Sequence, residues 1–298
     1  MAPQPSRRAA LPAIPRRLQQ RATFELLDFV ERIALPLDRS MARRSRISHD
    51  IPRLRDRKGG KLSYSDWCWL IGILQAEMHR LVDPDQGPTI VDLGCGAGLG
   101  AIAATSIVGT DGDYIGLDVR TEDVDFCSKH YAFPTHRFAV LDQKNDFYRA
   151  DGDSRVTWPI DDNSADMVTA VSVWSHLLEE DARFAFQEAS RVLKPGGHIL
   201  MTTFVTHADT PRPPSPTTSR FHNTSPQRWR FERSLGNGWY TTDWANPPEA
   251  AVAMSEASLR SALSDAGLAL ERIIQGTWSE RPGLFFQDIV IARAIDQA

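Results

Sequence analysis

The chain has 298 residues, of which 42% are hydrophobic and 24% charged, and its formal net charge is −4 at neutral pH. These proportions are typical of a globular protein and exclude collagen-like, disulfide-stapled and wholly disordered classes. At about 150 residues per domain, the length predicts two domains or one large α/β domain with additions. Three cysteines without CxxC spacing indicate no disulfide framework and fit a reducing, cytoplasmic location.

The charge is unevenly distributed along the chain. Residues 1–58 carry 14 basic and 6 acidic side chains, a net charge of +8. Such a segment can bind nucleic acid or an anionic membrane, or form a solvated tail. Because the arginines alternate with prolines and apolar residues, we interpret residues 1–22 as a disordered basic tail. No secretory signal opens the chain, and five glycines in the uncharged run Leu93–Thr110 favour a loop and a buried helix over a membrane span.

Two helices are predicted before residue 89. Phe24, Leu27, Val30 and Ala34 recur at helical spacing. A second helix should begin at Ser63, which is followed three residues later by an aspartate, and end at the turn Asp83-Pro84-Asp85. We expect residues 23–88 to form an N-terminal helical lid.

From residue 89 apolar strands alternate with helical patterns. We predict strands over 89–93, 114–118, 136–141, 167–172, 198–204, 268–274 and 285–292, and helices over 99–107, 122–131, 179–193 and 255–265. This alternation predicts a parallel sheet with helices on both faces, within one domain that spans 89–298. Residues 205–250 interrupt the alternation with seven prolines and six aromatic residues, so we interpret them as an irregular insertion on the substrate side.

The strongest motif lies between the first strand and the following helix. Gly94, Gly96 and Gly98 follow Asp92 in the strand–turn–helix context that a nucleotide-binding loop requires. Glycines there permit positive φ and a close approach of a ligand to the backbone. The GxGxG spacing differs from the GxGxxG fingerprint, which counts against a nicotinamide-dependent dehydrogenase.

Two carboxylates follow the next strands. Asp118 ends the second strand, 24 residues after Gly94, where a carboxylate can accept hydrogen bonds from two ribose hydroxyls or cap the following helix. Asp142 follows the third strand and can accept a hydrogen bond from an adenine amino group, unless it is simply a loop residue.

Five segments, in this order, resemble class I S-adenosylmethionine-dependent methyltransferases: 91–98, 114–118, 138–142, 172–177 and 191–197. The resemblance covers about residues 63–204. It implies an α/β, Rossmann-like fold with a seven-stranded, mostly parallel sheet, in which the last strand is inserted antiparallel between the fifth and sixth. It also implies S-adenosyl-L-methionine as the cofactor.

Carried over position by position, the resemblance implies a set of cofactor-binding residues: Asp92, Gly94, Cys95, Gly96, Gly98, Asp118, Val119, Asp142, Gln143, Ser172 and Trp174. Asp92 and the three glycines would hold the methionine moiety, and Asp118 the ribose. Val119 would pack against the adenine, with Asp142 and Gln143 at its edge. Ser172 and Trp174 would border the sulfonium and the methyl acceptor.

His176 and His207 follow the fourth and fifth strands and are the candidates for a general base, although each can also be a structural residue. We expect Trp174, Trp229, Trp239 and Tyr240, with Phe231 and Trp244, to form a substrate-binding wall or to anchor the insertion. The remaining histidines show no ligand spacing, so no structural metal is expected.

The predicted function is methyl transfer to a small molecule, most simply to a hydroxyl of a sugar or a secondary metabolite. The basic N-terminal segment favours an RNA or N-methyltransferase, but the Asn/Asp-Pro-Pro-aromatic motif of base-amino methyltransferases is absent after the fourth strand, so a nucleic acid partner is not expected. A non-catalytic cofactor-binding module is the third alternative. The sequence leaves a homodimer open and does not identify the acceptor.

Overall fold

The computed structural model describes residues 24–34, 50–57, 63–148, 155–207, 229–279 and 281–295. The predicted basic tail 1–22 and residues 208–228 of the predicted insertion lie outside the described residues. Within the described ranges, no helix combines the length and the apolar composition that crossing a bilayer requires.

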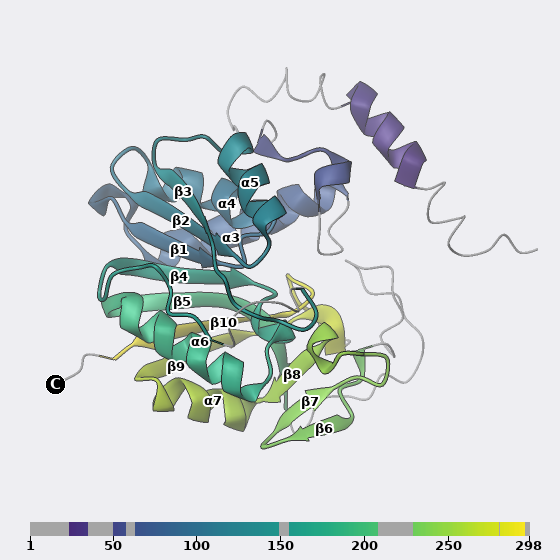
Figure 1. Cartoon of the computed structure of the whole chain (residues 1–298), viewed down its shortest axis with the longest axis vertical. Coiled ribbons are helices and arrows are strands. Elements are labelled where there is room, and N and C mark those ends of the chain that lie inside the picture. Colours follow the sequence, from purple (N-terminus) through teal and green to yellow (C-terminus); the bar gives the residue numbers. More distant parts are fainter. Residues whose placement is uncertain are drawn as a thin grey trace, which may run out of the picture.

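Seven strands form the main body of the sheet, in the spatial order β3-β2-β1-β4-β5-β10-β9 (Figure 1). The first five of these run parallel, and β10 is antiparallel to both of its neighbours, so the predicted insertion of the last strand is confirmed. The strands are β1 (Thr89–Leu93), β2 (Asp113–Asp118), β3 (His136–Val140), β4 (Ala165–Val171), β5 (Leu193–Thr206), β9 (Leu268–Ile274) and β10 (Asp288–Ala294).

Helices cover both faces of this sheet, as the alternating pattern predicts. One apolar core joins the sheet to α3 (Tyr64–Leu81), α4 (Leu99–Val108) and α5 (Thr121–His130). A second core joins the opposite face to α6 (Glu179–Val192) and α7 (Glu256–Asp265). Because the central strands contact helices on both sides, they are apolar along most of their length rather than alternating.

Local sequence signals set the ends of α3. The Ser63 hydroxyl accepts a hydrogen bond from the backbone N–H of Asp66 at 3.0 Å, which is the predicted N-cap. Trp67, Leu70 and Leu74 lie on the buried side of the helix and pack in the core that includes α4. This helix is therefore one layer of the domain, packed against the sheet together with α4.

The predicted helix around residues 24–34 is also present, but its apolar side chains do not enter the core. Leu26, Phe29 and Ile33 are each more than 60% exposed. A bidentate ion pair links this helix to residues 50–57: the buried guanidinium of Arg57 donates to both carboxylate oxygens of Glu31 at 2.7 Å.

Three further strands, two of them within residues 205–250 and one directly after it, correct the expectation that this segment is irregular. β6 (Arg233–Gly236), β7 (Trp239–Thr241) and β8 (Val252–Ser255) extend the sheet, so it has ten strands in the described part of the chain rather than seven. The cause is the length of β5, which has 14 residues. It begins at Leu193 and therefore includes Pro195, Gly196 and Gly197. Its last three residues continue past the neighbouring strands and pair in parallel with β8.

Candidate functional site

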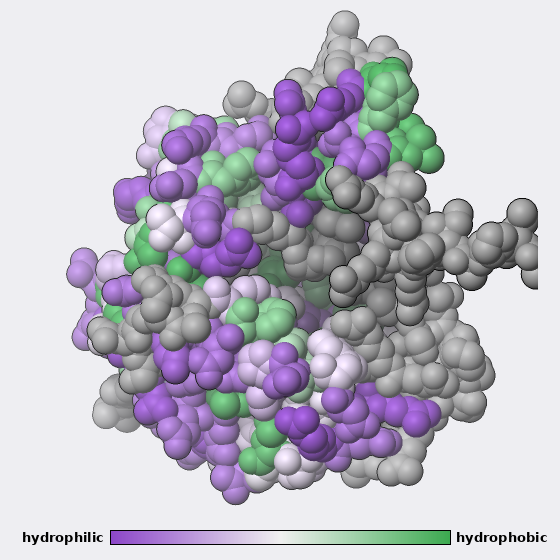
Figure 2. All heavy atoms as spheres, turned by 45° about the vertical axis from the view of Figure 1, so that its right-hand side comes forward, coloured by the Kyte–Doolittle hydropathy of each residue, from purple (hydrophilic) through white to green (hydrophobic). Residues whose placement is uncertain are grey.

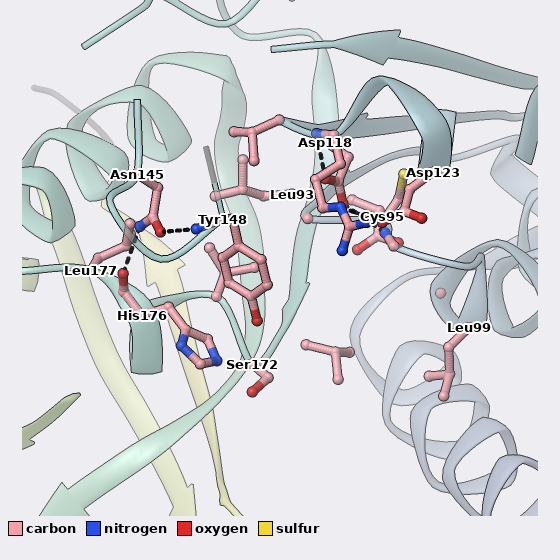
Figure 3. Close-up of a pocket in the computed structure, with 18 of the residues that line it drawn as sticks. Leu93, Cys95, Leu99, Asp118, Asp123, Asn145, Tyr148, Ser172, His176 and Leu177 are labelled. Carbon is pink, nitrogen blue, oxygen red and sulfur yellow. Dashed lines mark hydrogen bonds and ion pairs between the residues drawn. The ribbon is translucent and has the colours of Figure 1, made fainter. Parts of the chain in front are cut away.

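A cavity of about 760 Å³ opens at the carboxyl ends of the parallel strands (Figure 3). This volume lies within the range of small-molecule sites. Its walls come from the β1–α4 loop, the end of β2, the β3–β4 loop, the segment after β4 and the residues before β10, with the first turn of α3 beside them. Figure 2 shows a hollow in the middle of this face, with apolar atoms at its base and hydrophilic residues on its left side.

The glycine loop forms one end of the cavity. Gly94 and Gly96 have φ values of +69° and +52°, which side chains with a Cβ adopt only at a cost. A Cβ on Gly94 would lie 2.5 Å from the Val173 side chain, whereas a Cβ on Gly96 would meet only the Gly94 carbonyl oxygen, at 3.9 Å. Gly96 therefore leaves room at the cavity wall for a ligand that approaches the backbone closely.

Gly98 has a different role from the one predicted. Its φ is +87°, and a Cβ there would lie 2.0 Å from the ring of Tyr131, so the glycine is needed where α4 packs on this ring. It is not among the residues that line the cavity. The expectation that Gly98 contacts the cofactor directly is corrected: Gly98 allows the start of α4 to pack on Tyr131, on the side of the loop away from the cavity.

Asp92 is a buried carboxyl group at the base of the loop. Burial raises its pKa to about 7, and the nearby Asp118 adds to this, although the hydrogen bond from Tyr114 opposes it. The Tyr114 hydroxyl donates to Asp92 Oδ2 at 2.5 Å. Gly100 permits this arrangement, since a Cβ on Gly100 would lie 2.2 Å from the same oxygen. A positively charged ligand would favour the ionised form of this group.

The raised pKa of Asp92 predicts a pH dependence of stability. The folded protein keeps a proton that the unfolded chain releases above its ordinary carboxyl pKa of about 4, so this contribution is complete below pH 4 and is lost as the pH rises to about 7. Between these pH values the free energy of unfolding should fall by up to about 1.4 kcal/mol per pH unit, and Asp92→Asn should remove this pH dependence. Urea denaturation from pH 4 to pH 8 measures it, and equal slopes for variant and wild type would refute a buried titrating Asp92.

Asp118 closes the loop from the end of β2. Its Oδ2 accepts a hydrogen bond from the Gly96 N–H at 2.8 Å and its Oδ1 accepts one from the Arg120 N–H at 2.9 Å. Burial raises its pKa, and these two backbone bonds act in the opposite direction. Each carboxylate oxygen retains a second lone pair, so the group can still accept hydrogen bonds from vicinal hydroxyls.

Val119 and Gln143 line the cavity beside Asp118, as the resemblance implies, but Asp142 does not. The residues on either side of it, Leu141 and Gln143, are buried, and Asp142 is exposed. The next three residues, Gln143, Lys144 and Asn145, all line the cavity, whereas Asp142 does not. The predicted contact of Asp142 with an adenine is thereby corrected.

Cys95 lines the cavity but is not poised for chemistry. A hydrogen bond with Cys127 and burial raise the pKa of the Cys95 thiol well above its ordinary value. The Cys127 thiol donates to the Gly96 carbonyl oxygen at 3.1 Å. Cys95 is therefore a neutral group, and both cysteines pack under the loop.

His176 lies at the other end of the cavity, in the short helix η3 (Trp174–His176). Its Nδ1 lies 2.8 Å from the Glu249 carbonyl oxygen, which can only accept a hydrogen bond. Nδ1 must therefore carry a proton, and in the neutral ring Nε2 is the hydrogen-bond acceptor. Main-chain contact thus fixes the tautomer that a general base requires.

Sequence reasoning missed the residues that hold this histidine. Asn145 Oδ1 accepts from the backbone N–H groups of Phe147 and Tyr148, both at 3.1 Å, while its Nδ2 donates to the His176 carbonyl oxygen at 2.8 Å (Figure 3). The Phe147 ring lies parallel to the imidazole at 5.3 Å, and the Tyr148 ring meets it edge-on at 5.1 Å. Burial raises the pKa of Tyr148 to about 12, so its phenol stays neutral. An asparagine two and three residues before two aromatics is an Asx-turn signal that could have found this loop.

Four predicted residues lie away from the cavity. His207 pairs with Glu256, with 2.9 Å between Nδ1 and Oε2. Trp174 is fully buried, packs on Phe186 at 4.8 Å and donates its indole N–H to the Ala182 carbonyl oxygen. The other two are Trp239, which is buried in the core, and Tyr240, which packs beside the cluster around Phe204. These placements correct the predicted catalytic role of His207 and the predicted wall.

The wall is built instead from aromatics of separate segments. Trp229 is the member of the predicted wall that lines the cavity. It stacks on Phe204 of β5 with 5.1 Å between ring centroids and meets Phe286 edge-on, also at 5.1 Å. Trp67 of α3 and Phe285 add to the same lining. Across the described ranges, no three His, Cys, Asp or Glu side chains gather as a metal site.

Comparison with known proteins gives a consistent picture. Residues 91–201 match the family model described as a methyltransferase domain. The chain is 30% identical to an arsenite methyltransferase of Halobacterium salinarum over 42% of its own length and 29% of that protein. It is 28% identical to the O-methyltransferase cnsE of Penicillium expansum over 50% of its own length and 49% of that protein. The match thus spans less than half of each of these curated relatives.

Among solved structures, an S-adenosylmethionine-dependent methyltransferase from Mesorhizobium loti superposes with a TM-score of 0.50 at 20% identity. The superposition covers 75% of this chain and 99% of that one. At this identity the likeness establishes a shared fold.

Proposed function

We propose that the protein is a class I S-adenosylmethionine-dependent methyltransferase that transfers a methyl group to a hydroxyl of a small molecule, a sugar or a secondary metabolite. The match of residues 91–201 to a methyltransferase-domain model and the shared fold support this proposal. One observation carries the proposal: a single cavity joins the glycine loop and Asp118 to His176 and an aromatic wall. A site for the cofactor and a site for an acceptor with its base are therefore continuous. A cytoplasmic location belongs to the same proposal and is supported by three cysteines that form no disulfide.

The cofactor end fits S-adenosylmethionine, which supplies a methyl group already activated on a sulfonium. Gly94 and Gly96 keep the loop free of side chains where the ligand would approach the backbone. Asp118 would accept the ribose hydroxyls, with Val119 and Gln143 beside the adenine. The carboxyl group of Asp92 would ionise more readily next to a cationic ligand, so we expect binding to release protons near pH 7.

At the acceptor end the protein must align a nucleophile, remove its proton and exclude water. Correct alignment can supply about 7–11 kcal/mol. His176 Nε2 would accept the hydroxyl proton, because Nδ1 already donates to the Glu249 carbonyl oxygen. Phe147 and Tyr148 cover the ring and would limit access of water to it.

The residues that line the cavity favour a hydroxyl acceptor over arsenite, the acceptor named for the relative from Halobacterium salinarum. Trivalent arsenic is thiophilic and binds best to soft thiolate ligands. Among the described residues that line the cavity, Cys95 is the one thiol, and its raised pKa keeps it protonated. A hydroxyl acceptor instead matches the serine, glutamine and histidine side chains at this end.

Two measurements test the proposal. Calorimetry should detect binding of S-adenosylmethionine and of its demethylated product, S-adenosylhomocysteine. A radiolabelled methyl group should then pass to hydroxyl compounds in a panel that includes sugars, phenols, amines and RNA. Absence of cofactor binding would overturn the whole proposal. Transfer to RNA or to amines alone would overturn the hydroxyl acceptor, and binding without transfer to any panel member would favour a non-catalytic module.

Asp118→Ala should weaken S-adenosylmethionine binding by roughly 1–3 kcal/mol, because a buried, charge-assisted acceptor is lost. Asp125→Ala is the matched control, since Asp125 is exposed on α5. Titration calorimetry gives both dissociation constants. An unchanged dissociation constant in Asp118→Ala would remove the ribose-binding role.

A further inference from the structure

A closed hydrogen-bond network lies at the acceptor end of the cavity. The Ser172 N–H donates to Thr202 Oγ1 at 2.8 Å, and Thr202 Oγ1 donates to Gln287 Oε1 at 2.8 Å. Gln287 Nε2 donates to the hydroxyl oxygens of Ser172 and Ser175, both at 3.0 Å. These two hydroxyls lie 3.1 Å apart. The network joins the end of β4, the middle of β5 and the residue before β10.

The buried surroundings fix the direction of the first bonds. Thr202 is fully buried, and its oxygen already accepts the Ser172 N–H, so its hydroxyl hydrogen needs an acceptor. Gln287 offers that acceptor only with its carbonyl oxygen toward Thr202. The amide nitrogen must then face the two serines, and both of its hydrogens are used.

The same reasoning fixes the serine hydroxyls. Ser175 is fully buried, and its hydroxyl contacts Gln287 Nε2, which is a donor, and Ser172 Oγ. Its hydrogen must therefore go to Ser172 Oγ. Ser172 Oγ then accepts two hydrogen bonds, and its own hydrogen is left to point into the cavity, whose wall this residue forms.

The backbone of Ser172 supports a functional reading of this arrangement. Its φ is +67°, a left-handed conformation that is uncommon for residues other than glycine, asparagine and aspartate. Such conformations persist where the surroundings hold them, and they cluster at functional sites. Figure 3 shows the Ser172 side chain next to the His176 ring, with Tyr148 beside both.

We propose that Ser172 selects the acceptor: its O–H donates to the oxygen of an incoming hydroxyl, whose own hydrogen is donated to His176 Nε2. This inference rests on the proposed function. In the reaction, the acceptor oxygen uses a lone pair to form the new C–O bond, the C–S bond electrons remain on sulfur, and the hydroxyl proton passes to His176 Nε2. A hydroxyl oxygen has two lone pairs, so one can receive the Ser172 hydrogen while the other attacks.

An amine cannot use this site in the same way. A neutral amine nitrogen has a single lone pair, and a hydrogen bond from Ser172 would occupy the electrons needed for attack. The network therefore makes Ser172 a residue that selects oxygen over nitrogen. Gln287 is a positioning residue, because it acts by setting the direction of the Ser172 hydrogen.

The test measures binding of phenol, aniline and toluene to protein saturated with S-adenosylhomocysteine, by titration monitored with NMR. Phenol should bind roughly three- to tenfold more tightly than toluene, the scale of one net hydrogen bond, and more tightly than aniline. Ser172→Gly should abolish the preference for phenol over aniline and reduce the preference over toluene, which keeps the contribution of the bond to His176 Nε2. It adds no backbone strain, because glycine accepts a positive φ. Ser261→Ala, on the exposed side of α7, is the matched control and should keep the preference.

Other outcomes overturn the inference. The inference is wrong if phenol and toluene bind with equal affinity, or if neither binds. It is also wrong if Ser172→Gly lowers the affinity for S-adenosylhomocysteine instead of the affinity for phenol. Ser175→Ala should lower the preference only in part. A stronger preference in that variant would mean that Ser172 donates to Ser175, which reverses the network. If S-adenosylhomocysteine itself fails to bind wild-type protein, the failure belongs to the proposed function.

Discussion

Gly96→Leu should lower the affinity for S-adenosylmethionine roughly 30- to 160-fold while the protein stays folded. The nearest atom to a Cβ at this position is the Gly94 carbonyl oxygen, at 3.9 Å, so a side chain enters the cavity rather than the protein interior. Displacing a ligand from such a close approach costs about 2–3 kcal/mol, the scale of overpacking a well-fitted site. Calorimetric titration measures the loss.

Gly109→Leu is the control for the backbone. Gly109 also has a positive φ, +58°, and a Cβ there would meet nothing within 4 Å, but the residue does not line the cavity. Both variants therefore carry conformational strain, and both should lower the melting temperature. Only Gly96→Leu should lose cofactor affinity; an equal loss in both, or in neither, would contradict the assignment of the loop.

The parts of this site that sequence predicts are those built from local signals. The cap at Ser63 depends on residues three positions apart, and the glycine turn lies directly between β1 and α4. Asp118 ends β2, the next strand along the chain, and accepts a hydrogen bond from Gly96 of that turn. Parallel strands then bring their carboxyl ends to one edge, so the cofactor end of the cavity follows from the order of the elements. This is why Asp92, Gly94, Gly96 and Asp118 all line the cavity as predicted.

The acceptor end depends on non-local pairing and was predicted poorly. Gln287 reaches it because β10 is antiparallel to β5, so β10 begins at the edge where the parallel strands end. The next residue, Asp288, accepts hydrogen bonds from the Val205 N–H and the Gly276 N–H, both at 2.8 Å, and from the Trp278 indole at 2.7 Å. Burial raises its pKa, and these three bonds oppose the shift. One carboxylate thus ties the end of β5 to the segment that carries Gln287.

The aromatic residues of the sequence also predicted the cavity wall poorly, because their positions depend on neighbours that are distant in the chain. Trp174 and Trp229 both lie outside the main strands, but one packs on α6 and the other lines the cavity. What separates them is the neighbour each meets in space: Phe186 for the first, Phe204 and Phe286 for the second. Neither neighbour is close in sequence to Trp229, so no local pattern distinguishes the two residues.

The second large effect concerns the proton acceptor. His176→Ala should lower kcat for methyl transfer to a hydroxyl roughly 10²- to 10⁴-fold, the usual contribution of a positioned general base. Binding of S-adenosylmethionine should stay within about twofold of wild type, because the ring contacts Phe147, Tyr148 and the Glu249 carbonyl oxygen at the acceptor end. Added imidazole should restore part of the rate by entering the space that the ring leaves.

His207→Ala separates a base from a merely structural histidine. His207 is bonded to Glu256 and does not line the cavity, so its loss should affect stability and leave kcat nearly unchanged. If His176→Ala lowered cofactor affinity as much as kcat, His176 would be a cofactor contact. If both variants lost activity equally and neither responded to imidazole, the fixed tautomer at His176 would have no catalytic consequence. Rescue confined to His176→Ala is the result that only a proton acceptor at this position explains.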